Sequence, residues 1–261
     1  MYQAIRPHLA QHRAVTDNDR RARFVTVAGL ALMFIVVLVS AAIRLGQTAS
    51  PPLDAAALLA LRAAHRTAAS LEVLVVIWLG WLVWRMPSKP PFLVRDVALA
   101  AAMTLALSVL GILAGQSPPP PAAMANLLGG LALTAIFAGT LRILHEPAVR
   151  APAVAAGIGA VLLAVQCLLG AQLSVFHAPV SFPALPAHAM LGIMLASGAA
   201  WLALRNGNPL RRTAGFALAI LVPVAGFTVL HYEGSAAAAF AHAAAVALLL
   251  VVSAYTRLRP A

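Results

Sequence analysis

Residues 24–43 read FVTVAGLALMFIVVLVSAAI and contain no charged side chain. A helix needs about 20 such residues to cross a hydrocarbon core roughly 30 Å thick. This stretch follows an arginine-rich tail, as the core of a secretory signal does, but it is longer than a signal core. We therefore expect residues 24–43 to form a membrane-spanning helix.

Seven further apolar segments of similar length follow this one. Of the 261 residues, 62% are hydrophobic and only 10% are charged, far fewer charges than the surface of a soluble domain carries. The run Pro118–Pro121 separates the third segment from the fourth, because proline cannot continue a helix. The sequence predicts an all-α membrane protein with eight transmembrane helices, the last seven at 64–84, 97–115, 124–143, 153–174, 186–204, 213–231 and 238–256.

The basic residues are distributed unevenly between the two sides of this predicted topology. If the N-terminus is cytoplasmic, 15 of the 18 basic residues fall on the cytoplasmic side: Arg6, Arg13, Arg20, Arg21, Arg23, Arg85, Lys89, Arg95, Arg142, Arg150, Arg205, Arg211, Arg212, Arg257 and Arg259. Only Arg44, Arg62 and Arg66 remain for the other side. This positive-inside bias predicts that both termini are cytoplasmic, and it fits a bacterial inner membrane.

The net charge of +11 does not indicate a nucleic-acid partner. Its basic residues form short flanks beside apolar segments, and no basic stripe with interleaved aromatic residues is present. We expect membrane lipid to be the surrounding partner and exclude nucleic acid.

The two halves of the chain match each other at three short stretches. These pairs are Ser40–Ile43 with Gly170–Leu173, Ala64-His65 with Ala187-His188, and Ala122–Asn126 with Ala238–His242. The matches predict two pseudo-repeated four-helix bundles, formed by an N-terminal half (24–150) and a C-terminal half (151–261) after a cytoplasmic tail (1–23).

His188 and His242 form the strongest candidate site. Polar side chains inside a membrane are costly, and both histidines lie near the non-cytoplasmic ends of their predicted helices. Imidazoles from two facing helices are suitable axial ligands for heme iron, and bundle interiors commonly hold this cofactor. The alternative is a pair of interfacial histidines that bind water or a backbone carbonyl.

The N-terminal half offers a less complete set of candidate residues. Arg62 and Arg66 flank His65, and arginine suits the carboxylates of a porphyrin near that histidine, although both side chains can instead extend to the interface. Glu72 lies two helical turns deeper on the same face, where a carboxyl group either relays protons or stays neutral by burial. Asn126 stands opposite His65 and cannot replace imidazole as a strong iron ligand.

Other chemistries lack the motifs that they require. The chain has no phosphate-binding glycine loop, no His-Glu-x-x-His and no Cys-x-x-Cys, so ATP-driven transport and thiol redox chemistry are unsupported. Cys167, the single cysteine, is expected to be a structural thiol. A secondary transporter remains an alternative, with Pro223 as the candidate for an interrupted helix.

This pattern resembles the heme A synthase family, whose members have two four-helix halves. The resemblance covers most of the chain in topology and rests on His65-Arg66, His188, His242 and the segment Ile43-Arg44-Leu45. Asn126 stands where the family has its remaining histidine. The chain also departs at Arg62, where an outer carboxylate is expected, and Asp54 is the only acid in the first outer loop.

The resemblance implies both a cofactor and a reaction. It implies that His188 and His242 ligate the iron of heme b, and that the N-terminal half binds a porphyrin substrate, heme O, near His65. The family oxidises a methyl group of heme O to the formyl group of heme A for cytochrome oxidase assembly, which implies heme O synthase or oxidase assembly factors as partners. His65 and Glu72 are the candidate catalytic residues. The alternative is a non-catalytic membrane b-type cytochrome or heme-handling assembly factor.

Overall fold

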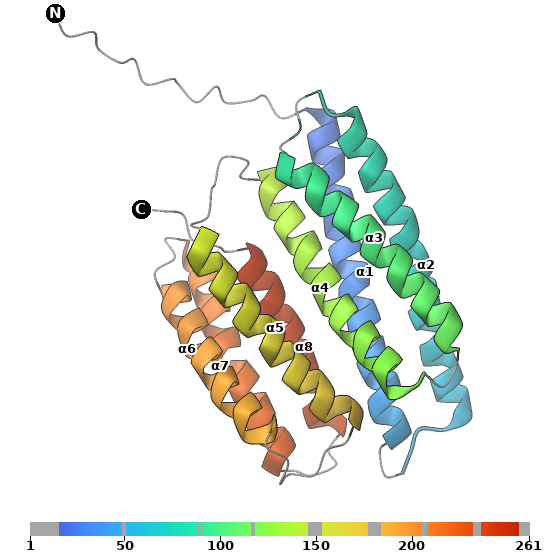
Figure 1. The fold of residues 1–261 in the computed structure, drawn as a ribbon, viewed down its shortest axis with the longest axis vertical. Helices are drawn as coiled ribbons and strands as arrows, with labels where there is room; N and C mark the ends of the chain where they lie inside the picture. Colours follow the sequence, from blue (N-terminus) through green and yellow to red (C-terminus); the bar gives the residue numbers. More distant parts are fainter. Residues whose placement is uncertain are drawn as a thin grey trace, which may run out of the picture.

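The computed structural model describes residues 16–48, 51–87, 89, 91–115, 118–145, 153–176, 184–204, 208–231 and 236–255. These residues form eight α-helices (Figure 1): α1 Asp17–Thr48, α2 Ala55–Arg85, α3 Pro91–Ala114, α4 Pro120–His145, α5 Ala153–Phe176, α6 Ala184–Leu204, α7 Pro209–His231 and α8 Ala236–Tyr255. Each of the eight predicted segments falls on one of these helices. Residues 1–15 of the predicted tail and Arg150, Arg205, Arg257 and Arg259 lie outside the described residues.

Several helices begin at residues whose chemistry favours a helix start. Before α1, the Thr16 hydroxyl accepts a bond from Asp19 N (3.2 Å), and the Asp19 carboxylate accepts one from Thr16 N (2.9 Å). Asp54 caps α2 by accepting a bond from Ala57 N at 2.7 Å. Helices α3, α4 and α7 begin at a proline, which fits the first helical turn because its missing amide hydrogen is not needed there.

These caps explain why two helices are longer than the apolar segments. The sequence predicted spans from residue 24 and residue 64, whereas α1 begins at Asp17 and α2 at Ala55. The added turns contain charged side chains and are held by the caps. His65 therefore lies about three turns into α2 instead of opening it.

Six helices, namely α1, α2, α3, α4, α6 and α7, are long and apolar enough to cross a membrane. The described side chains of α5 and α8 cover shorter apolar stretches, Val161–Leu173 and Ala237–Val252. The chain is thus a multi-pass membrane protein. Pro223 lies inside α7, which is a continuous helix from Pro209 to His231.

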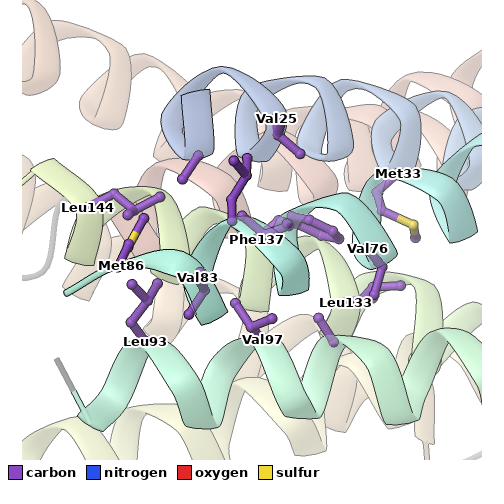
Figure 2. Close-up of a cluster of buried hydrophobic side chains, with 14 residues drawn as sticks. Val25, Met33, Val76, Val83, Met86, Leu93, Val97, Leu133, Phe137 and Leu144 are labelled. Atoms are coloured by element: carbon purple, nitrogen blue, oxygen red, sulfur yellow. The ribbon is translucent and has the colours of Figure 1, made fainter. Parts of the chain in front are cut away.

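The first four helices enclose a tightly packed core. Helix α1 packs against α2 and α4, and α3 packs against the same two helices. Phe137 of α4 is fully buried in this core, and Figure 2 shows it near Val25 of α1 and Val76 of α2. A Cβ atom on Gly29 would lie 2.6 Å from the Phe137 ring, so glycine permits the close approach of α1 and α4.

The last four helices lie side by side next to the first four (Figure 1). Helix α6 packs against α5 and α7, and α7 packs against α8. Helices α4 and α8 contact each other, and further contacts join α1 to α8 and α4 to α5. A small cluster of buried side chains fills this junction, formed by Val37, Leu131, Ala247 and Leu250. The half-buried free thiol of Cys167 packs against this cluster.

Tryptophan side chains stand on the outer surface of α2 near its C-terminal end. Trp78, Trp81 and Trp84 are exposed, as expected for an aromatic anchor at a membrane interface. Arg85 lies over the Trp81 ring and Lys89 over the Trp84 ring, each 5.0 Å from the ring centroid. The two cations and the two rings therefore lie at the same height along the axis of α2.

Candidate heme site

Three histidines lie toward the same end of the molecule. We call this the lower end: α1 ends there and α2, α6 and α8 begin there, at the bottom of Figure 1. His188 lies about one turn into α6, His242 about two turns into α8 and His65 about three turns into α2. All three side chains are partly buried.

The structure brings His188 and His242 together. Their ring centroids are 6.3 Å apart, and the ring planes meet at 78°. Helices α6 and α8, which carry them, both pack against α7. Two imidazoles that ligate one metal ion from opposite sides, at about 2 Å each, have ring centroids roughly 6 Å apart. The spacing of this pair would therefore allow both imidazoles to hold one metal ion.

His242 is oriented by a backbone group of the neighbouring helix. Its Nδ1 lies 3.1 Å from the carbonyl oxygen of Val222 on α7. In the tautomer that donates this hydrogen bond, Nε2 keeps its lone pair for a metal ion. Ligating histidines commonly use such a second bond to fix the ring and raise its basicity.

His188 lies against α5. Its ring lies next to the backbone of Gln166. Its Nδ1 is buried and has no hydrogen-bond partner among the described residues. An unpaired polar atom of this kind is uncommon in a folded interior, and it leaves this ring able to accept another partner.

Two glycines make room for the two rings. A Cβ atom on Gly170 of α5 would lie 2.9 Å from His188 Cε1, and one on Gly226 of α7 would lie 3.2 Å from His242 Cε1. Both distances are shorter than ordinary van der Waals contact. The backbones of α5 and α7 thus approach the imidazoles as closely as glycine allows.

Among the described residues, the site offers two imidazole ligands. Within the described part of the chain, no three histidine, cysteine, aspartate or glutamate residues gather at one point. A protein site for a bare transition metal usually supplies three or four ligands. A porphyrin supplies four nitrogens itself, so two axial histidines complete its iron.

Comparison with known proteins finds no matching family model and no matching curated protein. The chemistry of the site therefore rests on the contacts of its own residues.

His65 has a different environment from the paired histidines. Its ring lies next to the backbone of Val36 on α1, and its Nδ1 is buried without a hydrogen-bond partner among the described residues. Arg44 and Arg66 are the cations near this ring. Arg66 is exposed, whereas Arg44 is partly buried and donates a bond to the Ser40 hydroxyl at 3.2 Å.

Three other residues of the N-terminal half have clear positions. Asp54, the only acid of the first outer loop in the predicted topology, caps α2 about 16 Å along the helix from His65. Asn126 is partly buried on α4. Arg62 is partly buried one turn before His65 on α2. Because the Asp54 carboxylate caps α2, it has a structural role that does not require a substrate.

Glu72 is the most deeply buried acidic residue of the described chain. Its side chain is 2% exposed, and neither carboxyl oxygen has a hydrogen-bond partner among the described residues. It lies on the buried face of α2 with Ala68 and Val76. Its position fits a neutral carboxyl group better than a charged one, because an uncompensated charge is costly in such a place.

Several residues of these sites were not predicted as site residues. Arg44 was recognised only as part of a motif, although it is one of the three basic residues assigned to the non-cytoplasmic side. Gly170 and Gly226 were also missed, because a glycine in an apolar helix carries no sign of what lies against it. Only the packing of the helices reveals these contacts.

Proposed function

We propose that the chain is a heme-binding membrane protein of the heme A synthase type. In this proposal His188 and His242 would hold the iron of heme b in the C-terminal half. The observation that carries the proposal is the 6.3 Å spacing of the two rings, with His242 held by the Val222 carbonyl. A heme bound in this way supplies one-electron transfer.

We further propose that the eight helices cross the membrane as two repeated four-helix bundles. Support comes from the register that aligns Ser40–Ile43 with Gly170–Leu173, because it also aligns Val36 with Gln166. Val36 is the backbone neighbour of His65, and Gln166 is the backbone neighbour of His188. Two histidines that match in sequence thus lie against matching positions of the preceding helix.

In the same proposal the N-terminal half binds the porphyrin substrate, heme O. His65 faces the substrate, and Arg44, Arg62 and Arg66 are the cations available for its propionates. Arginine is suited to this role by its bidentate geometry. The reaction is the oxidation of a heme O methyl group to the formyl group of heme A, which takes one oxygen atom from water and passes four electrons to an external acceptor. Glu72, about two turns farther into the bundle than His65, is the group that handles protons. Heme O synthase and oxidase assembly factors are the expected partners.

A second candidate function is that of a non-catalytic b-type cytochrome or heme-handling assembly factor. Two observations favour it: Asn126 stands where the family has a second histidine, and the Asp54 carboxylate is already used as a helix cap. Both changes affect the N-terminal half and leave the His188–His242 pair intact. In this second function the chain binds heme b but does not oxidise heme O.

The proposed location is a bacterial inner membrane, with both termini in the cytoplasm. Support comes from the positive-inside bias of the sequence. It also comes from the fold, because α1 begins and α8 ends at the upper end of the molecule in Figure 1, opposite the histidines. The heme would then lie toward the outer face of the membrane.

Coexpression with a heme O synthase separates these functions. Extracted hemes would be resolved by liquid chromatography and compared with those from His65→Ala and from cells without the protein. The first function predicts heme A or its hydroxylated precursor, with product lost in His65→Ala. Heme b without any oxidised product would contradict it and support the cytochrome. Absence of both heme and product would leave the secondary transporter.

A further inference from the structure

Besides the histidines, the N-terminal helices contain a set of buried polar side chains, and one of them is the Glu72 of the proposed reaction. Glu72 of α2 is 2% exposed, Thr104 of α3 is 7% exposed and Thr134 of α4 is fully buried. The Thr134 hydroxyl donates to the Gly130 carbonyl at 2.8 Å. The Thr104 hydroxyl and both Glu72 carboxyl oxygens have no partner among the described residues.

Glu72 and Thr104 lie at about the same height in the bundle. A Cβ atom on Gly80 of α2 would contact Val97 of α3 at 4.0 Å, which fixes the register of this helix pair. The two helices run in opposite directions (Figure 1). Glu72 lies eight residues before Gly80, and Thr104 lies seven residues after Val97. Both therefore lie about 10–12 Å from that contact, on the same side of it.

Thr134 lies at this height as well. A Cβ atom on Gly29 of α1 would contact both Val75 of α2, at 3.0 Å, and Phe137 of α4. Glu72 comes three residues before Val75, and Thr134 comes three residues before Phe137. Since α2 and α4 run in the same direction (Figure 1), each lies about one turn from the Gly29 contact, toward the lower end. We call Glu72, Thr104 and Thr134 the polar layer.

No positive charge lies at the height of the polar layer in these four helices. The charged or titratable residues nearest in height are Arg23 of α1, His65 and Arg66 of α2, Asp96 of α3 and Arg142 of α4, each at least six residues away along its helix. Six residues correspond to about 9 Å. A carboxylate at Glu72 would therefore be buried without a counter-ion, a state that proteins avoid by protonating the group.

We propose that the polar layer is a proton-binding site, in which Glu72 is a neutral carboxylic acid linked through water to Thr104. A neutral acid has one O–H donor and one carbonyl acceptor, and a bridging water can satisfy both, together with the Thr104 hydroxyl. The unpaired polar atoms of the layer are then explained by a single protonated, hydrated group.

The route for this proton runs along α2 toward the lower end. His65 lies two turns from Glu72 on the same face, about 10 Å along the axis. Between them the buried face carries Ala68, whose side chain is only a methyl group. His65 Nδ1 is buried and unpaired among the described residues, so it can take up or release the proton. This inference rests on the Glu72 and His65 of the proposed function but needs no heme, so its failure would leave the proposed heme site at His188 and His242 untouched.

Infrared spectroscopy of the full-length protein in lipid nanodiscs tests the proton site. The chain has only seven acidic residues, so the carbonyl stretch of one neutral carboxylic acid can be resolved and identified by its shift in D2O. The proposal predicts this band in the unmodified protein and in Asp54→Asn, and its loss in Glu72→Gln. Absence of the band, or its persistence in Glu72→Gln, would overturn the proposal.

Two further measurements keep the test independent of any folding defect in Glu72→Gln. Dicyclohexylcarbodiimide reacts with protonated carboxyl groups in apolar surroundings, so it should modify Glu72 in the unmodified protein, as located by mass spectrometry. The infrared band should also shift into D2O several-fold more slowly in His65→Ala than in the exposed control Thr67→Ala. An unmodified Glu72 would refute the neutral acid, and equal exchange rates would refute the route through His65.

Discussion

At the residue scale, the contacts of the paired histidines depend on two glycines, which have no side chain. Gly170 and Gly226 leave space where a methyl group would press on His188 and His242. Alanine and glycine are common in membrane helices for plain packing reasons. At these two positions the close neighbour is an imidazole, so the glycines set where the rings lie.

Gly170→Ala should displace His188 and weaken heme binding. Its new Cβ would lie 2.9 Å from His188 Cε1, and overpacking of this kind costs about 1–3 kcal/mol. We expect heme affinity to fall about tenfold, measured by titrating heme into the purified apoprotein. Gly198→Ala on α6 is the matched control, since its new methyl group meets nothing within 4 Å. Equal losses in both variants would contradict the role of Gly170.

The sequence predicts the three histidines as candidate site residues, but it does not predict which residues lie against them. His65, His188 and His242 could be selected because polar residues are rare in apolar helices. The position of Arg44 near His65 could not be predicted from the sequence, because it depends on how α1 crosses α2. Thr104 was missed for the same reason: a threonine in a membrane helix usually bonds to its own backbone, and only its unpaired hydroxyl makes it notable.

At the element scale, helix ends are set by local chemistry that hydropathy does not report. Apolar length located the eight helices, but the true starts of α1 and α2 depend on the caps at Thr16 and Asp54. The break at Pro118–Pro121 was predicted correctly: α3 ends at Ala114 and α4 begins at Pro120. Gly115 between them has φ 64°, a left-handed conformation that glycine adopts without strain.

Asp54→Ala should destabilise the start of α2 without affecting heme. Loss of the bond from Ala57 N removes an N-cap, which costs about 1 kcal/mol. The thermal midpoint in detergent should fall by a few degrees, while the heme spectrum stays unchanged. Asp54→Ser, which can still cap, is the matched control. A lost heme spectrum in Asp54→Ala would instead indicate that this carboxylate belongs to a binding site.

Gly29→Val should disrupt the packing of α1 against α4. The new side chain would begin 2.6 Å from the Phe137 ring, which is fully buried. We expect a loss of about 1–3 kcal/mol in the free energy of unfolding, measured by steric trapping in bicelles. Gly111→Val on α3 serves as the control because its Cβ meets nothing within 4 Å. Similar stability of both variants would contradict this packing.

At the scale of the whole molecule, the helix directions place the histidines at one end and the tryptophan anchor of α2 toward the other. The charge bias assigns the histidine end to the outer side. Single cysteines at Asp54 and Lys89, in a Cys167→Ala background, test this assignment, because both positions are exposed on opposite ends of α2. A membrane-impermeant maleimide applied to spheroplasts should label position 54 and not position 89. The reverse labelling would invert the topology.

The sequence does not predict how the first four helices pack against the last four. Its contacts involve α1, α4, α5 and α8, and its buried residues are ordinary apolar side chains such as Val37 and Leu250. Nothing distinguishes them in sequence from lipid-facing residues, because both surfaces are equally apolar. The sequence predicts eight helices, but not the surfaces through which they pack against one another.

A reduced-minus-oxidised absorption spectrum tests whether His188 and His242 ligate one heme. The protein would be expressed with heme precursors, purified and compared with His188→Ala, His242→Ala and the exposed control His145→Ala. The account predicts bands typical of a b-type heme in the unmodified protein and in His145→Ala, and their loss or marked shift in the other two. A protein without heme bands, or bands unchanged in His188→Ala and His242→Ala, would contradict it.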